Sequence, residues 1–76
     1  MEIKVCGPGC PNCAKAEAAV REAVAQAGVR ATVEKVTDFS EMARLGVLST
    51  PAIVIDGVVK CVGKVPTPKE ILAWLR

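Results

Sequence analysis

Polar and apolar residues alternate along several short stretches of the chain, and these stretches predict the strands of a small sheet. Residues 2–6 alternate in this way, and residues 29–36 form a second stretch of the same kind. Residues 52–55 are continuously apolar, which is typical of a strand buried on both faces. Asp56-Gly57 predicts a two-residue hairpin turn, after which residues 58–62 return as the partner strand.

The longest helix is predicted to follow the first strand. Gly7-Pro8-Gly9 interrupts that strand, and Pro11 suits the first turn of a helix, where a missing N–H costs nothing. Gly28 is the residue type that ends helices in a left-handed conformation. Between these limits, apolar residues recur at helical spacing at Ala16, Val20, Val24 and Ala27.

Two shorter helices are predicted further along the chain. Asp38 is a suitable N-cap with Glu41 three residues later, and this helix should end near Leu45. Thr67 and Glu70 have the same cap spacing and predict a last helix.

The predicted order of elements is βαβαββα, which indicates an α/β fold and a single domain over residues 1–76. The first crossover helix implies that the first two strands are parallel neighbours, because right-handed crossovers between parallel strands are the default. The hairpin adds an antiparallel edge to the sheet. No linker, internal repeat or low-complexity segment divides the chain.

Composition and charge narrow the classes of function. The net charge is +2, and acidic and basic residues are interspersed, so we expect no nucleic-acid binding. No apolar run approaches the roughly 20 residues of a membrane span, and the first residues lack the apolar block of a signal peptide. We therefore expect a cytoplasmic protein with no membrane partner. In that reducing compartment, closely spaced cysteines indicate redox chemistry or metal binding.

Cys10-Pro11-Asn12-Cys13 is a CxxC motif at the point where a loop enters the first helix. A thiolate is the species that attacks a disulfide, and the unpaired N–H groups and dipole of a helix N-terminus stabilise negative charge. We therefore expect Cys10 to be the exposed nucleophile, whereas Cys13 faces inward and resolves the mixed disulfide. The redox-active disulfide serves in place of a cofactor, and no other cofactor is expected.

Metal binding is the main alternative for these cysteines. A structural zinc site normally has four ligands, and the chain, which has no histidine, would need Cys6 and Cys61 to complete one. Copper-chaperone domains also carry a CxxC after a first strand, but their elements follow the order βαββαβ. The spacing Cys6-x3-Cys10-x2-Cys13 matches an iron–sulfur motif of radical SAM enzymes, which need a barrel far larger than this chain.

Cys6 is interpreted as a small buried hydrophobe, which free cysteine often is. An accessory role, through an alternative disulfide with Cys10, stays open at this point. Cys61 lies in the fourth predicted strand. A disulfide requires Cα atoms within about 7 Å, so no bridge between Cys6 and Cys61 is expected if another strand lies between the first and the fourth, as the resemblance described below implies. Lys4, Lys60 and Lys64 are interpreted as solvated surface charges.

Thr50-Pro51 is a second chemical signal. A proline that opens a buried strand is unusual unless it makes a turn or a cis bond, and X–Pro bonds are the only ones at which the cis form is cheap. A plain proline at the start of a strand is the simpler alternative. The apolar loop Gly7-Pro8-Gly9, together with Leu48 and Ser49, predicts a shallow docking surface for a partner protein.

Taken together, these residues resemble the thioredoxin/glutaredoxin superfamily, and more closely its small thioredoxin-like members called redox-active disulfide proteins. The similarity runs nearly end to end. Its most specific stretches are residues 9–13, 34–38 and 46–52, and it extends over residues 54–57 and 63–66.

The resemblance implies a thioredoxin-like fold, with a four-stranded mixed sheet in the order second, first, third and fourth strand and with flanking helices. It implies that Cys10 attacks and Cys13 resolves, that Pro51 is cis beside the motif, and that the Thr50 backbone pairs with a substrate strand. The implied function is a glutaredoxin-like or thioredoxin-like electron carrier that reduces protein disulfides. Its reductase would be a flavin-dependent enzyme similar to thioredoxin reductase, and we expect a monomer.

The sequence departs from the classical pattern around the motif. Gly9 stands where thioredoxins have Trp, and Pro11-Asn12 replaces their Gly-Pro. Val62-Gly63 only partly matches the Gly-Gly turn that glutaredoxins use against glutathione. Besides the metal-binding alternative, a redox-sensing interaction domain without turnover remains a possible function at this point.

Overall fold

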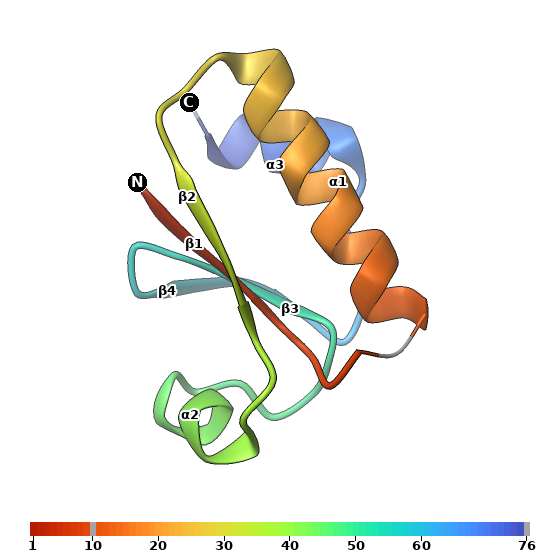
Figure 1. The fold of residues 1–76 in the computed structure, drawn as a ribbon, viewed down its shortest axis with the longest axis vertical. Coiled ribbons are helices and arrows are strands. Elements are labelled where there is room, and N and C mark those ends of the chain that lie inside the picture. Colours follow the sequence, from red (N-terminus) through yellow and green to blue (C-terminus); the bar gives the residue numbers. More distant parts are fainter. Residues whose placement is uncertain (10, 76) are drawn as a thin grey trace.

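The computed structural model describes residues 1–9 and 11–75, and its strands form one sheet in the order β2-β1-β3-β4 (Figure 1). β1 is parallel to β2, and β3 is antiparallel to both β1 and β4. The predicted thioredoxin-like α/β class, element order and strand order are therefore confirmed. The elements are β1 (Glu2–Cys6), α1 (Pro11–Ala27), β2 (Thr32–Val36), α2 (Phe39–Arg44), β3 (Ala52–Ile55), β4 (Val58–Val62) and α3 (Pro68–Trp74).

Helices cover both faces of this sheet. α1 and α3 lie side by side over one face, and α2 covers the other (Figure 1). Side chains alternate along β1, so that Ile3 and Val5 pack toward α1 and α3, whereas Cys6 packs toward α2. Two separate apolar clusters result. The larger one includes Val20, Ile53 and Ile71, and the smaller one includes Val36, Met42 and Val54.

The inward face of α1 differs slightly from the predicted one. Its buried residues are Cys13, Ala16, Val20 and Ala23, and Val24 is half-buried. Ala27, which was expected to face inward, is exposed because it is the last residue of the helix and the packed stripe ends at Ala23 and Val24. None of the described helices is long and apolar enough to cross a membrane.

The second strand begins later than the sequence pattern predicted. Its pairing with β1 starts at Thr32, whose N–H donates a hydrogen bond of 2.9 Å to the carbonyl of Met1. Val29 and Ala31 belong to the connection before the strand and pack against the edge of the larger cluster. Apolar alternation alone extends the strand too far, because a connecting segment can also bury its alternate side chains.

The predicted cap of the last helix is present, whereas that of the second helix is only partly as expected. At α3, Thr67 accepts a hydrogen bond from the Glu70 N–H, and the Glu70 carboxylate accepts one from the Thr67 N–H. At α2, Asp38 accepts from the Ser40 N–H at 2.8 Å. Glu41 instead forms an ion pair with Lys4 of β1, at 3.7 Å.

The hairpin between β3 and β4 has the predicted turn. Asp56 and Gly57 have φ angles of 49° and 83°, as a two-residue turn of this kind requires. The ladder of β4 is interrupted by a register shift between Ile53 and Val54. Cys61 pairs with Ile53 while Val59 pairs with Val54, so Lys60 is the extra residue of a β-bulge on this edge strand.

Candidate redox site

Cys13 is the third residue of α1 and is almost completely buried. Only 1 % of it is exposed, and it is disulfide-bonded. Pro11 begins the helix as predicted, and Pro11 and Asn12 are both exposed at this end. Cys10, the predicted nucleophile, lies outside the described residues.

The N-terminus of α1 is electrostatically suited to a thiolate. The helix has 17 residues, and its first turn contains no acidic side chain that would offset the positive end of the dipole. The unpaired N–H groups and dipole at such an end stabilise a nearby negative charge and lower the pKa of a cysteine placed there. Cysteine chemistry is thus favoured at this end of the helix.

Gly7 lies at the centre of the site, between the two segments that the sequence singled out. Its N–H donates a hydrogen bond of 2.9 Å to the Val36 carbonyl, and the residue is buried. A Cβ placed on Gly7 would overlap the Cys13 Sγ and would lie 3.8 Å from the Thr50 Cβ. The backbone of Gly7 is therefore packed against Cys13, with Thr50 close by.

Thr50-Pro51 is brought to the site by the start of β3. The Thr50–Pro51 peptide bond is cis, the conformation that the resemblance implied. Pro51 is buried, Thr50 is half-buried, and the Pro51 carbonyl accepts a hydrogen bond of 2.8 Å from the Gly63 N–H. The structure thus brings the segment before β3 together with the first turn of α1.

Four of the five residues of the predicted docking surface are exposed. Leu48 is 91 % exposed, and Pro8, Gly9 and Ser49 are also exposed. Gly7, which was expected to contribute to this surface, is buried, because its backbone continues the pairing of β1 with β2 and packs against Cys13. The sequence indicated Gly7 as a strand breaker and as part of an exposed loop, but it could not show the contact with Cys13, since the order of residues does not show what an added side chain would touch.

Cys6 and Cys61 carry free thiols and lie on opposite faces of the sheet. Cys6 is fully buried in the cluster under α2, whereas Cys61 is 8 % exposed and belongs to the cluster under α1 and α3. Burial raises the pKa of the Cys6 thiol, and the charge of Lys4 offsets part of that effect. Burial also raises the pKa of Cys61, so both thiols are held in their less reactive protonated form.

The opposite orientation of Cys6 and Cys61 bears on the metal-binding alternative. A four-cysteine site would have to draw ligands through the sheet from both of its faces. Within residues 1–9 and 11–75, no three His, Cys, Asp or Glu side chains are grouped so that they could hold a metal ion.

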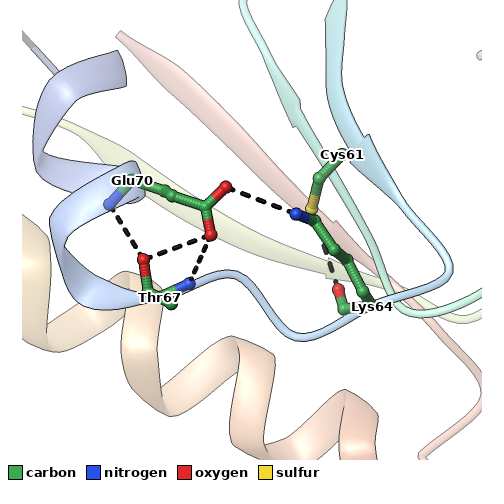
Figure 2. A network of polar contacts seen from close by, with 4 residues as sticks. All are labelled: Cys61, Lys64, Thr67 and Glu70. Carbon is green, nitrogen blue, oxygen red and sulfur yellow. Dashed lines mark hydrogen bonds and ion pairs between the residues drawn. The ribbon is translucent and has the colours of Figure 1, made fainter.

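Two of the three lysines that were predicted to be solvated charges form ion pairs, and one of these, Lys4, is half-buried. Lys4 pairs with Glu2 and Glu41, and Lys64 pairs with Glu70 at 3.4 Å (Figure 2). Lys60 is exposed at the bulge of β4.

The loop between β4 and α3 is held by a small polar network (Figure 2). The Cys61 thiol donates a hydrogen bond of 3.8 Å to the Lys64 carbonyl, and the Lys64 ammonium contacts the carboxylate of Glu70. Glu70 in turn caps α3 together with Thr67. The loop that contains Gly63, the hydrogen-bond donor to Pro51, is thus tied to the first turn of α3.

The model of the family described as a thioredoxin domain matches residues 1–76. The chain belongs to the thioredoxin domain family. It is 35 % identical over 71 residues to a thioredoxin of Methanothermobacter thermautotrophicus, and the aligned region covers 93 % of this chain and 92 % of that protein. It is 39 % identical over 74 residues to a thioredoxin of Methanocaldococcus jannaschii, covering 97 % of this chain and 85 % of that protein. The superfamily resemblance is therefore confirmed, and membership of the thioredoxin domain family supports thiol–disulfide exchange in general terms.

Proposed function

We propose that this chain is a small thiol–disulfide oxidoreductase that reduces protein disulfides through a dithiol formed by Cys10 and Cys13. The single observation that carries the proposal is the place of Cys13, which is buried and disulfide-bonded in the first turn of α1. Family membership and the similarity to two thioredoxins support the same chemistry. The role of Cys10 rests on the CxxC spacing and on the resemblance.

The proposed cycle transfers two electrons from the protein dithiol to the substrate disulfide. The Cys10 thiolate attacks one sulfur of the substrate, the substrate S–S bond breaks, and the departing thiolate takes up a proton. A mixed disulfide now joins Cys10 to the other substrate sulfur. Cys13 loses its proton and attacks the Cys10 sulfur, which releases the second substrate thiol and leaves a disulfide between Cys10 and Cys13.

Each cysteine has an environment that suits its part of this cycle. The first residues of α1 favour a thiolate, because the unpaired N–H groups and the helix dipole stabilise negative charge and no carboxylate in this turn offsets them. Cys13 is too buried to meet a protein substrate directly, which suits a residue that acts only after the mixed disulfide has formed. The free thiols of Cys6 and Cys61 are buried with raised pKa values and take no part in the cycle.

The proposed partners are protein disulfides and a flavin-dependent reductase. The exposed residues Leu48, Pro8 and Gly9 would provide apolar contacts for a docked protein. The backbone at Thr50 would pair with an extended segment of the substrate, as the resemblance implies. The reductase would return two electrons to the disulfide between Cys10 and Cys13 after each turnover.

Turnover of insulin disulfides with dithiothreitol as electron donor tests the proposal. We expect activity in the wild type, loss of activity in Cys10→Ser, and a trapped mixed disulfide in Cys13→Ser. Cys61→Ser is the matched control, because it removes a thiol that points into the core away from the cycle. Activity that survives in Cys10→Ser would exclude the proposed nucleophile, and binding without turnover in the wild type would favour a redox-sensing domain.

A further inference from the structure

We propose that Gly7 is a positioning residue, whose missing side chain provides the space that the Cys13 sulfur needs in order to form a stable disulfide. This inference rests on the proposed function, because it assigns Gly7 a part in the redox chemistry of Cys13. The observation behind it is the close approach of the Gly7 backbone to the side chain of Cys13.

The space on Gly7 is already occupied by Cys13. A Cβ on Gly7 would overlap the Cys13 Sγ and would lie 2.8 Å from the Cys13 Cβ, a separation that real Cβ atoms essentially never show. Movement of the Cys13 Sγ alone would not relieve this contact fully, because the Cys13 Cβ is also too close and its position is fixed by the backbone of α1. Any side chain at position 7 would therefore displace Cys13.

Gly7 itself has little freedom to move away. Its N–H is bonded to the Val36 carbonyl at 2.9 Å, which continues the pairing of β1 with β2. It directly follows Cys6, which is fully buried in the cluster under α2. Since the backbone of Gly7 is fixed by the sheet, the displacement falls on the side chain of Cys13.

Conformational freedom of the backbone is not the reason for glycine at this position. The five other glycines of the chain have positive φ angles, whereas Gly7 is outside that left-handed region. A positive φ, the usual backbone reason for glycine, therefore does not apply at Gly7. The requirement at position 7 is therefore one of space beside Cys13.

This contact affects the two redox states of Cys13 unequally. Reduction of the disulfide takes up two electrons and two protons and yields the thiols of Cys10 and Cys13. In the disulfide, the Cys13 Sγ is held by a covalent bond, so it cannot rotate away from an added Cβ. In the dithiol form the Sγ can change rotamer, which removes the overlap with Sγ and leaves only the contact with the Cys13 Cβ. Gly7→Ala should therefore weaken the disulfide relative to the dithiol.

The main experiment measures the thiol–disulfide equilibrium in glutathione redox buffers, by alkylation and mass spectrometry. We expect Gly7→Ala to shift the equilibrium constant toward the dithiol by at least tenfold, which corresponds to about 30 mV for a two-electron couple. Gly28→Ala is the control, because its φ of 66° makes alanine unfavourable there while no atom lies within 4 Å of the added Cβ. A shift below twofold in Gly7→Ala, or an equal shift in Gly28→Ala, would overturn the inference.

A double-mutant cycle covers the case in which Gly7→Ala folds poorly. The second substitution is Cys13→Gly, which removes both atoms that an added Cβ would approach within 3 Å. We expect Gly7→Ala to lower the urea midpoint of the reduced wild type and to leave that of Cys13→Gly nearly unchanged. An equal loss in both backgrounds, or a double variant that remains unfolded while Cys13→Gly folds, would show that Cys13 is not the neighbour that matters.

The two experiments separate the inference from the proposed function. A wild type that forms no reversible disulfide in the glutathione buffers would overturn the proposed function, and with it the redox role of Gly7. A wild type that does so while Gly7→Ala behaves like it would overturn the inference alone.

Discussion

Glu2 and Asp56 exchange two hydrogen bonds that join the start of β1 to the β3–β4 turn. The Glu2 N–H donates to Oδ1 of Asp56 at 2.7 Å, and the Asp56 N–H donates to the Glu2 carbonyl at 2.8 Å. Asp56 also has a φ of 49°, a conformation that aspartate and asparagine tolerate better than most residues. One side chain thus serves both the turn and the pairing of β1 with β3.

Substitution of Asp56 should separate these contributions. We expect Asp56→Ala to lower the free energy of unfolding by about 1–2 kcal/mol, because it loses the accepted hydrogen bond and is less tolerant of the left-handed conformation. Asp56→Asn is the matched control, since its Oδ1 can accept the same bond, and it should lose much less. Urea unfolding measures both variants, and equal losses would show that the Oδ1 contact contributes nothing.

The cap of α3 should make stability depend on pH. Hydrogen bonds from Thr67 to its carboxylate, and then the Lys64 contact, hold the pKa of Glu70 below its usual range. Because the pKa is lower in the folded protein, the stabilisation is present above the ordinary glutamate pKa and is lost as pH falls through the folded pKa. The difference in stability between the wild type and Glu70→Gln should therefore shrink on acidification. A difference that stays constant between neutral and strongly acidic pH would contradict this assignment.

The free thiols of Cys6 and Cys61 should be unreactive in the folded protein. Both are buried with raised pKa values, so little thiolate is present at neutral pH. We expect iodoacetamide to modify them at least tenfold more slowly in native protein than in urea, as peptide mass mapping would show. Rapid native alkylation of Cys6 would instead support the accessory redox role that the sequence left open.

Leu48 should contribute to the turnover of protein substrates and little to stability. It is 91 % exposed, so Leu48→Ala should change the free energy of unfolding by less than about 0.5 kcal/mol. If the substitution removes about 1 kcal/mol of binding free energy toward a docked protein, KM for insulin should rise about fivefold. Turnover of a small disulfide should not change. Val58→Ala is the control, because Val58 is also exposed but lies at the hairpin end of the sheet. Equal effects of the two substitutions would remove the docking role from Leu48.

The sequence predicted the elements well where a local signal determined them. Pro11 marked the start of α1, Asp56-Gly57 marked the hairpin, and Thr67 with Glu70 marked the cap of α3. The start of β2 was placed too early, because the side chains of Val29 and Ala31 also pack against the core without belonging to the strand. Local patterns of this kind cannot distinguish a strand from a connection that packs against its edge.

The candidate site was predictable in its residue types and less so in its arrangement. The CxxC motif and Thr50-Pro51 could be found separately, but only the folded chain shows that Gly7 packs between Cys13 and the neighbourhood of Thr50. The opposite orientation of Cys6 and Cys61 could not be predicted either. The order of strands does not determine the face of the sheet to which a side chain points, and the register of pairing does. Such relations depend on which backbone atoms meet across the sheet, which no single stretch of sequence specifies.

The bulge at Lys60 has a consequence for the behaviour of the molecule at high concentration. β4 is an edge strand, and an uninterrupted edge can template the addition of a strand from another molecule, which begins aggregation. Here the ladder is shifted at the middle of the strand, and the extra residue is an exposed lysine. An incoming strand would meet an irregular row of donors and acceptors and a charge that it would have to desolvate. The irregular edge therefore disfavours intermolecular β-sheet growth at β4.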